Sequence, residues 1–276
     1  MGMRPVCFLS DFGFADDFVG TCKGVMLGIV PGLSIVDLTH DVPGFGIEPG
    51  AETLQHATRY MPSDTVYLAV VDPGVGTDRR GLALRTNSNA FLVGPDNGLL
   101  IPAAEALEGV AEAVVLDNPE YRVHPVSNTF HGRDIFAPAA AHLASGVALP
   151  ELGTGVDLAS LTHQIVLETP GDPDGTVETR IIDIDRFGNA RLSIRYDESG
   201  LRYGDWLRIE AGDGQMSVRY LETFGSSKAG ELMVVPDSHW RLSLCINQGN
   251  ASHALALKVG GLVRLTREGG TGGGGA

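Results

Sequence analysis

The sequence predicts an α/β protein: an N-terminal α/β domain with a largely parallel central sheet, followed by a smaller C-terminal all-β, barrel-like domain. Over about the first 150 residues, short apolar runs alternate with segments of helical spacing, which is typical of a parallel sheet covered by helices. After the Pro, Gly and Asp cluster at 170–175, helical spacing gives way to short alternating runs. We therefore expect an N-terminal domain with its linker over 1–169, a β domain over 170–267, and a disordered Gly-rich tail over 268–276.

The chain begins with the pattern of a strand, a loop and a helix. Val6 to Leu9 is a short apolar run, and we expect Asp16 or Asp17 to cap the helix that follows. Pro31-Gly32 stops that helix. One face of the helix is formed by Phe18, Cys22, Val25, Met26 and Ile29.

The alternation of strand and helix continues beyond this first unit. We expect a strand at 34–38 and a helix from Glu48 to Tyr60, with Pro49 tolerated in its first turn. The nearly all-apolar run 65–71 predicts a strand buried on both faces, with Asp72 at its carboxyl end. Further expected elements are strands at 82–85, 90–93 and 113–116, and a helix over 135–143 closed by Gly146. In the β domain we expect strands at 176–184, 206–209, 216–221, 232–235 and 242–246.

Composition limits the partners and the compartment. The formal net charge of −14 makes nucleic acid and anionic membrane surfaces poor partners, because both would be repelled. Cys7, Cys22 and Cys245 are odd in number and lie in apolar context, so they indicate buried thiols in a reducing compartment. No apolar stretch approaches the ~20 residues that a membrane span needs. We expect a cytoplasmic protein.

Two carboxylates follow apolar strands and are the first candidates for chemistry. Asp11 and Asp72 would lie at the carboxyl ends of their strands, where ligands bind in open α/β sheets, although either could instead cap a helix or form a turn. The Gly-rich loop after Asp72 lacks the Lys and Ser/Thr of a P-loop, so its phosphate signal is weak. Of Arg79 and Arg80, adjacent at a strand start, we expect one to face the crevice and the other to be solvated.

A histidine precedes the helix expected at 135–143. His131 lies where a loop would face the crevice and could position or deprotonate water, with a surface histidine as the competing interpretation. We interpret Asp134 as a charge at the helix N-terminus. The other histidines form no HxxxH or HExxH pair, and we interpret them as structural.

A divalent metal site is the strongest rival interpretation of the acidic segment. Carboxylates and imidazole are suitable ligands, and a metal-dependent nucleotidase or phosphatase could begin with such a loop. The candidate ligands are Asp11, Asp16, Asp17, His40, Asp41 and Asp72.

A turn in the β domain offers groups that could recognise a base. In the segment 185–189, Gly188 bends the chain, while Phe187 could stack on a base and Asn189 could pair with it. An ordinary hairpin turn is the alternative.

Four motifs in register, FLSDFGFADDFVGTCKG, VVDPGVGTDRR, TFHGRDIFAP and DRFGN, resemble the S-adenosyl-L-methionine (SAM) hydrolases, or SAM hydroxide adenosyltransferases. These are related to fluorinating and chlorinating adenosyl-transferring enzymes. The resemblance implies that water displaces methionine from C5′ of SAM, with Asp72, Arg79 and His131 handling the water. The halogenating relatives carry Tyr at the position of Asp72 and lack the histidine, so the resemblance favours hydroxide.

The resemblance also implies a set of substrate contacts. A sulfonium departs as a neutral thioether, so the reaction needs no metal and no cofactor. The family is homotrimeric, with SAM bound between the N-terminal domain of one subunit and the C-terminal domain of the next. Many relatives have Gly and Glu where this chain has Trp240 and Ser243. A non-catalytic SAM- or adenosine-binding protein is a separate alternative. The implied contacts are Asp11 to the ribose, Phe45 beside it, Phe187 and Asn189 to adenine, and Ser238, Ser243 and Ile246 around adenine and methionine.

Overall fold

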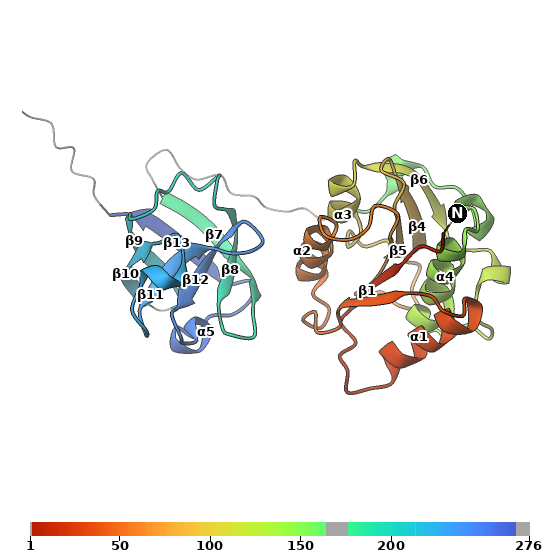
Figure 1. The fold of residues 1–276 in the computed structure, drawn as a ribbon, viewed down its shortest axis with the longest axis horizontal. Coiled ribbons are helices and arrows are strands. Elements are labelled where there is room, and N and C mark those ends of the chain that lie inside the picture. Colours follow the sequence, from red (N-terminus) through yellow and green to blue (C-terminus); the bar gives the residue numbers. More distant parts are fainter. Residues whose placement is uncertain (1, 164–175, 213, 269–276) are drawn as a thin grey trace, which may run out of the picture. The chain divides into compact units, whose positions relative to one another are not determined.

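The computed structural model describes residues 2–163, 176–212 and 214–268, which fall into two compact units, Met1–Ile165 and Val166–Ala276 (Figure 1). The domain boundary expected at residue 170 and residues 269–276 of the expected Gly-rich tail lie outside the described residues, whereas residue 268 is described. The N-terminal elements are β1 (Val6–Ser10), α1 (Phe18–Ile29), β2 (Ile35–Thr39), α2 (Ile47–Ala57), β3 (Val66–Val70), β4 (Gly81–Thr86), β5 (Phe91–Pro95), α3 (Ile101–Ala106), β6 (Val110–Val115), η2 (Gly132–Phe136) and α4 (Ala137–Ser145). Short 3₁₀ turns are η1 (Pro119–Tyr121), η3 (Leu149–Leu152) and η4 (Leu158–Ser160).

The N-terminal unit has a six-stranded sheet in the order β2-β1-β3-β5-β4-β6. Strands β2, β1, β3 and β5 pair in parallel, whereas β4 is antiparallel to both of its neighbours. The prediction of a largely parallel sheet is therefore confirmed, with β4 as the reversed strand. The reversal is local, because a short turn joins β4 to β5 as a hairpin.

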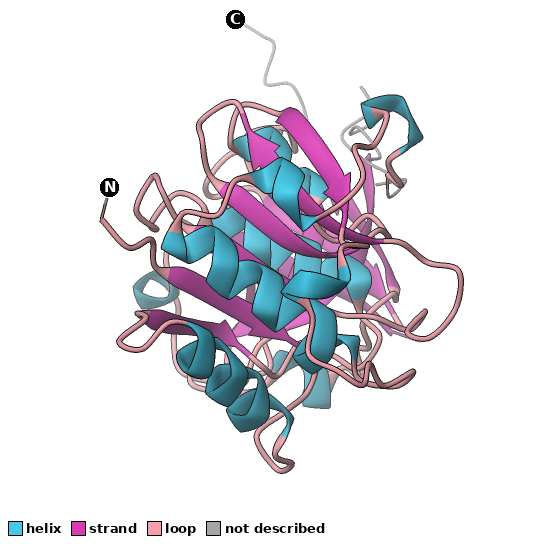
Figure 2. Cartoon of the chain, turned by 90° about the vertical axis from the view of Figure 1, so that its right-hand side faces the viewer, coloured by secondary structure: helices cyan, strands magenta, loops and turns pink. Residues whose placement is uncertain are grey.

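Helices cover both faces of this sheet, and the alternation of side chains along the strands explains why (Figure 2). Phe8 of β1 packs in the apolar cluster that contains residues of α1 and α4. Leu9, the next residue, packs in the cluster that contains residues of α2 and α3. A strand whose side chains are buried on both faces must be apolar throughout, as the residues of β1 and β3 are.

The C-terminal unit is a closed β-barrel with strand order β10-β11-β12-β8-β7-β13-β9. Its core is apolar and includes Val177, Leu207 and Leu244. Its elements are β7 (Thr176–Ile184), β8 (Ala190–Arg195), β9 (Trp206–Ala211), β10 (Gly214–Tyr220), η5 (Phe224–Ser226), β11 (Leu232–Pro236), β12 (Arg241–Ile246), α5 (Ala251–Ala254) and β13 (Leu262–Arg267). Closure leaves no unpaired sheet edge, and the expected α/β unit with a β-barrel unit is confirmed.

Two further observations concern expectations from composition. Cys7, Cys22 and Cys245 are free and buried, and burial raises the pKa of each thiol to about 12. In the described part of the chain, no helix has the length and apolarity needed to cross a bilayer.

Candidate functional site

Two neighbouring strands bring Asp11 and Asp72 to the same edge of the sheet. Asp11 follows β1 directly, and Asp72 lies two residues beyond the end of β3. The two strands are parallel, with Ser10 opposite Val70. Both carboxylates therefore lie at the carboxyl ends of strands, as the sequence predicts.

Asp72, Arg79 and His131 form one connected polar cluster. Arg79 donates to both carboxylate oxygens of Asp72, with Nε to Oδ1 at 3.1 Å and Nη2 to Oδ2 at 2.6 Å. The same Nη2 lies 3.0 Å from Nδ1 of His131. The side chains of Arg79 and Asp72 are only 9% and 6% exposed, so solvent screens this pair weakly.

Burial sets the proton chemistry of this cluster. Burial raises the pKa of Asp72 above its usual value, although Arg79 and His131 act in the opposite direction. Burial and the charge of Arg79 lower the pKa of His131. A guanidinium can only donate, so Nδ1 of His131 accepts and the proton of the neutral ring is on Nε2. The cluster therefore holds a carboxylate of enhanced basicity beside an imidazole N–H donor.

The loop that carries Asp72 and Arg79 is stabilised by its own backbone bonds and by a close contact. The N–H groups of Val75 and Thr77 donate to the carbonyls of Asp72 and Gly74. Because these two N–H groups are used within the loop, they do not form a phosphate cradle. Gly76 has φ +77°, and a Cβ there would lie 2.3 Å from the carbonyl oxygen of Asn128. The loop thus lies directly against the segment that leads to His131.

The expectation that one arginine of the pair would be solvated is wrong. Arg79 faces Asp72, but Arg80 donates through Nε to Oδ2 of Asp96 at 2.7 Å. Arg80 also donates to the hydroxyl of Ser160 at 3.0 Å, and Asp96 accepts the N–H of Thr162 at 2.9 Å. Asp96 was too far along the sequence to be identified as a partner. Arg80 thus holds the 158–162 segment against the sheet.

A small cavity of about 170 Å³ connects the candidate residues of this unit. Asp11 accepts the N–H of Phe45 at 3.0 Å, and Phe45 has φ +64°, a backbone conformation rare outside glycine. The Phe45 side chain is 74% exposed. The lining consists of the predicted residues Asp11, Phe45, Asp72 and His131, together with Phe12, Val70, Val75, Thr129, Phe130 and Gly132. The apolar lining was not predicted, because nothing in a Phe or Val reveals whether it lines a cavity or fills a core.

Asp11 and Asp72 line one cavity, but the six residues considered as metal ligands do not gather into one metal site. Asp17 is the N-cap residue of α1, as predicted, but its side chain accepts from the Thr21 hydroxyl and makes no cap bond to a backbone N–H. Both ring nitrogens of His40 are within hydrogen-bond distance of protein groups, Ser10 and Asp37. Among residues 2–163, 176–212 and 214–268, no group of three or more His, Cys, Asp or Glu side chains is arranged to hold a metal ion.

Asp134 stabilises the segment that carries His131. It lies in the first turn of η2, as predicted, but it is fully buried. Arg133 pairs with it at 2.6 Å, and its Oδ2 accepts the N–H of Ser127 at 2.8 Å. Burial raises the pKa of Asp134, but these bonds have the larger combined effect and lower the pKa overall. Asp134 is therefore both the predicted charge at the start of the helix and the residue that fixes the start of the 127–131 loop.

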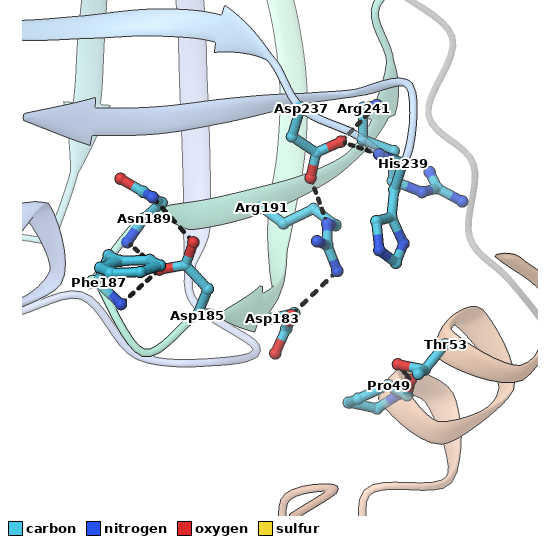
Figure 3. Close-up of polar contacts among 10 residues, drawn as sticks. All are labelled: Pro49, Thr53, Asp183, Asp185, Phe187, Asn189, Arg191, Asp237, His239 and Arg241. Carbon is cyan, nitrogen blue, oxygen red and sulfur yellow. Dashed lines mark hydrogen bonds and ion pairs between the residues drawn. The ribbon is translucent and has the colours of Figure 1, made fainter. Parts of the chain in front are cut away.

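The C-terminal unit has its own cavity, of about 800 Å³. At its edge, Oδ1 of Asp185 accepts the N–H groups of Phe187 and Asn189, which makes the predicted turn, with Gly188 at φ +82° (Figure 3). The Phe187 side chain is 65% exposed, whereas the Asn189 amide donates to Oδ2 of Asp185 at 2.8 Å. Asn189 therefore has only its amide oxygen and one N–H left for a ligand. All five predicted residues of this unit line the cavity: Phe187, Asn189, Ser238, Ser243 and Ile246.

This cavity also contains an arginine that was not predicted, Arg191. Arg191 donates through Nη1 to Asp183 at 3.0 Å and through Nε to Asp237, so it lies between two carboxylates (Figure 3). Its position two residues after Asn189 on the alternating strand β8 was the signal that could have identified it. Asp237 also accepts the N–H groups of His239 and Arg241, which closes a turn.

That turn explains the glycine of the family pattern. Trp240 has φ +63°, in the left-handed region where glycine carries no steric penalty. This chain has a bulky residue in that conformation. Ser243, at the position of the family's Glu, is 3% exposed yet lines the cavity.

Fold and sites together define a class: an α/β protein with an appended β-barrel and a polar cavity in each unit. Comparison with known families identifies it further. The family profile of the SAM hydroxide adenosyltransferase N-terminal domain matches residues 6–153, and that of the C-terminal domain matches residues 179–264. The chain belongs to the SAM hydroxide adenosyltransferase family, and the resemblance inferred from the four motifs is confirmed.

Individual relatives agree with this assignment. A protein of Salinispora tropica named (R)-S-adenosyl-L-methionine hydrolase is 41% identical over 261 residues, which cover 95% of this chain and 97% of the relative. A Thermus thermophilus protein of the same name is 40% identical over 270 residues, covering 95% and 100%. A fluorinase of Actinopolyspora mzabensis is 28% identical over 293 residues, covering 96% and 98%. The crystal structure of a conserved protein from Thermotoga maritima superposes with a TM-score of 0.87 at 35% identity, covering 95% and 100%.

Proposed function

We propose that this protein hydrolyses SAM to adenosine and L-methionine by in-line attack of water on C5′, without a metal or other cofactor. The observation that carries the proposal is the connected cluster of Asp72, Arg79 and His131 at the carboxyl end of β3. The relatives named as (R)-S-adenosyl-L-methionine hydrolases support the choice of substrate.

The geometry of the cluster suggests how the water is handled. Arg79 occupies Nδ1 of His131, so the Nε2–H of the ring is the donor that holds the oxygen of the water. Asp72 accepts a proton from that water, and the raised pKa of its carboxyl group makes it a better base than an ordinary aspartate. Arg79 keeps the Asp72 carboxylate in one orientation through its two bonds.

The reaction balances without a further reactant. The water oxygen forms a bond to C5′ while the C5′–S bond breaks and its electron pair goes to sulfur, which leaves as the thioether of methionine. One water proton passes to Asp72 and then to solvent. Because the leaving group is neutral, the protein needs only to orient the nucleophile and exclude bulk water. The apolar side chains Val70, Val75 and Phe130 line the cavity beside Asp72.

Substrate contacts follow from the two half-sites. Asp11 binds the ribose hydroxyls and Phe45 lies beside the ribose. The adenine and methionine portions bind in the C-terminal cavity, with Phe187 and Asn189 on the base and Ser238, Ser243 and Ile246 around the remainder.

We further propose a homotrimer in which each site combines half-sites of two subunits. Mixing Asp72→Ala and Asn189→Ala chains tests this. In a shared site, random assembly restores about a quarter of the wild-type activity, because one interface in four contains two intact halves. Monomers by light scattering with full activity, or mixtures no better than the parents, would contradict the trimer.

The decisive experiment is turnover of SAM in ¹⁸O-water with chloride present, read by mass spectrometry. We expect adenosine carrying one ¹⁸O atom, unlabelled methionine, and no 5′-chloro-5′-deoxyadenosine. Binding of SAM without any product would leave a non-catalytic binding protein as the better interpretation. Loss of turnover in EDTA, restored by a divalent cation, would favour the metal-dependent nucleotidase or phosphatase.

The cellular setting is part of the same proposal. We propose that the enzyme works in the cytoplasm, since its three buried free thiols fit a reducing compartment. A net charge of −14 disfavours nucleic acid and anionic membranes as partners.

A further inference from the structure

A hydrogen-bonded series of polar side chains, buried at Ser10 and His40 and partly exposed at its far end, has no role in the proposed chemistry. Nδ1 of His40 lies 2.7 Å from the hydroxyl of Ser10, and Nε2 lies 3.1 Å from Oδ1 of Asp37. Lys23 pairs with the other oxygen of Asp37 at 2.5 Å. Ser10 and His40 are both fully buried. Neither can therefore touch a ligand, and a Ser-His-Asp arrangement of this kind cannot supply a nucleophile.

Each hydrogen bond in this series of polar side chains has a defined donor and acceptor. Burial raises the pKa of Asp37, but the bonds from Lys23 and His40 lower this pKa overall. The ionised carboxylate of Asp37 therefore accepts both hydrogen bonds. Nε2 of His40 therefore donates to it, and in the neutral ring Nδ1 accepts the proton of the Ser10 hydroxyl. The Ser10 oxygen in turn accepts the N–H of Phe12 at 3.4 Å. Because Ser10 and His40 are buried and both ring nitrogens of His40 have partners, these two side chains are held in a single arrangement.

His40 holds the backbone on both sides of Asp11. Its ring bonds the side chain of Ser10, the residue before Asp11. Its carbonyl accepts the N–H of Gly13, two residues after Asp11, at 2.7 Å. The rings of Phe8 and Phe14 lie edge-on to the His40 ring, with centroids 4.6 and 5.1 Å away, and restrain it.

We propose that His40 and Ser10 are positioning residues for Asp11. They fix the backbone from which the Asp11 carboxylate reaches the N–H of Phe45 and the cavity. This inference rests on the proposed function in one respect only, the assignment of Asp11 to the ribose. The consequence for SAM is a contribution to binding made through Asp11.

Two substitutions of the histidine separate its two ring contacts. In His40→Asn the side-chain oxygen can replace Nδ1 and accept from Ser10, whereas in His40→Gln the side-chain amide can replace Nε2 and donate to Asp37. Both variants lose the ring and its packing. If the Ser10 contact positions Asp11, then His40→Gln and Ser10→Ala raise the KM for SAM about tenfold with kcat nearly unchanged, and His40→Asn raises it much less.

A double substitution tests whether the effect passes through Asp11. Adding His40→Gln to Asp11→Asn should raise KM by less than about twofold beyond Asp11→Asn alone, because the group that His40 positions is already lost. Independent, multiplying effects would overturn the proposal, as would equal KM values for His40→Asn and His40→Gln. If His40→Gln fails to fold, Ser10→Ala takes its place in the same comparison.

A measurement without substrate keeps this inference separate from the proposed function. Amide hydrogen exchange of Gly13 and Phe45 should be about tenfold faster in His40→Gln and in Ser10→Ala than in the wild-type protein, with His40→Asn closer to wild type. Unchanged exchange at both amides would overturn the positioning role. A wild-type protein without SAM turnover but with this exchange pattern would refute the proposed function alone.

Discussion

Arg79→Met is the most informative single substitution in the proposed water-handling cluster. Methionine keeps much of the volume of the side chain but removes the two donors to Asp72 and the donor to His131. The guanidinium carbon also lies 5.3 Å from the centre of the Phe136 ring, so an apolar replacement suits the space. The substitution therefore tests the charge and the hydrogen bonds more than the packing.

The expected magnitude follows from the burial of the pair. With side chains 9% and 6% exposed, Arg79 and Asp72 interact with little screening, and the Arg79→Met variant leaves a buried carboxylate without its partner. Breaking a buried pair in this way costs about 3–5 kcal/mol. If about 3 kcal/mol of this appears as lost transition-state stabilisation, kcat falls about a hundredfold.

The pH dependence provides a second, independent readout. Burial already raises the pKa of Asp72 and Arg79 opposes that rise, so removing Arg79 raises this pKa further. A base must be deprotonated to act, so activity is lost as the pH falls through the pKa. The acid limb of the kcat profile should therefore move to higher pH, measured by the release of methionine at saturating SAM.

Arg80→Met is the matched control. Arg80 forms a comparable pair with Asp96, but its contacts hold the 158–162 segment rather than the cavity. We expect it to lower the free energy of unfolding without shifting the acid limb. An Arg79→Met enzyme with kcat within about threefold of wild type and an unmoved acid limb would refute the proposed roles of Asp72 and Arg79.

Three further predictions concern the loop, the base-binding face and the histidine. Gly76→Ala, whose Cβ would lie 2.3 Å from the Asn128 carbonyl, should lower the free energy of unfolding by about 3 kcal/mol, whereas Gly32→Ala at φ +82° in open space should cost about 1 kcal/mol; equal losses in urea titrations would contradict the close contact. Phe187→Ala should raise KM about tenfold with unchanged thermal stability, because the ring is 65% exposed and base stacking contributes about 1–3 kcal/mol; an unchanged KM would remove Phe187 from the site. Because folding lowers the pKa of His131, the unfolded chain gains its proton first, and stability decreases as the pH falls below about 6.5 towards the lower folded pKa. His131→Asn should show a smaller decrease, and an identical one would exclude His131 as its source.

Elements with strong periodicity were predictable, and weakly patterned ones were not. β7 begins and ends as the sequence predicts, because its alternation is long and its flanks are clear. Helix α3, with only six residues and Pro102 in its first turn, has too short a pattern to show helical spacing. β8 and β13 were also not predicted. β8 directly follows the 185–189 turn, and only the turn was recognised in that part of the sequence.

Candidate side chains were predictable as residue types at strand ends, but their partners were not. Asp11 and Asp72 could be brought to one edge by a general property of parallel sheets. The contact between Arg79 and His131 depends on how the 72–80 loop folds against residue 128, and no local sequence pattern encodes that packing. The pairing of Arg80 with Asp96 was not predictable for the same reason, because it depends on a tertiary contact between residues 16 positions apart.

Asp72 and Arg79, which are joined by two hydrogen bonds, belong to the same short loop, whereas His131 comes from elsewhere in the chain. Backbone bonds from Val75 to Asp72 and from Thr77 to Gly74 shape that loop from within. The carboxylate and its guanidinium are therefore a transferable unit for protein engineering. Grafting the 72–80 segment as a whole carries both charges in register, whereas exchanging Asp72 alone leaves a buried cation without its counter-ion. In the proposed chemistry, a change of nucleophile therefore requires a change of this loop, with the histidine as a separate second step.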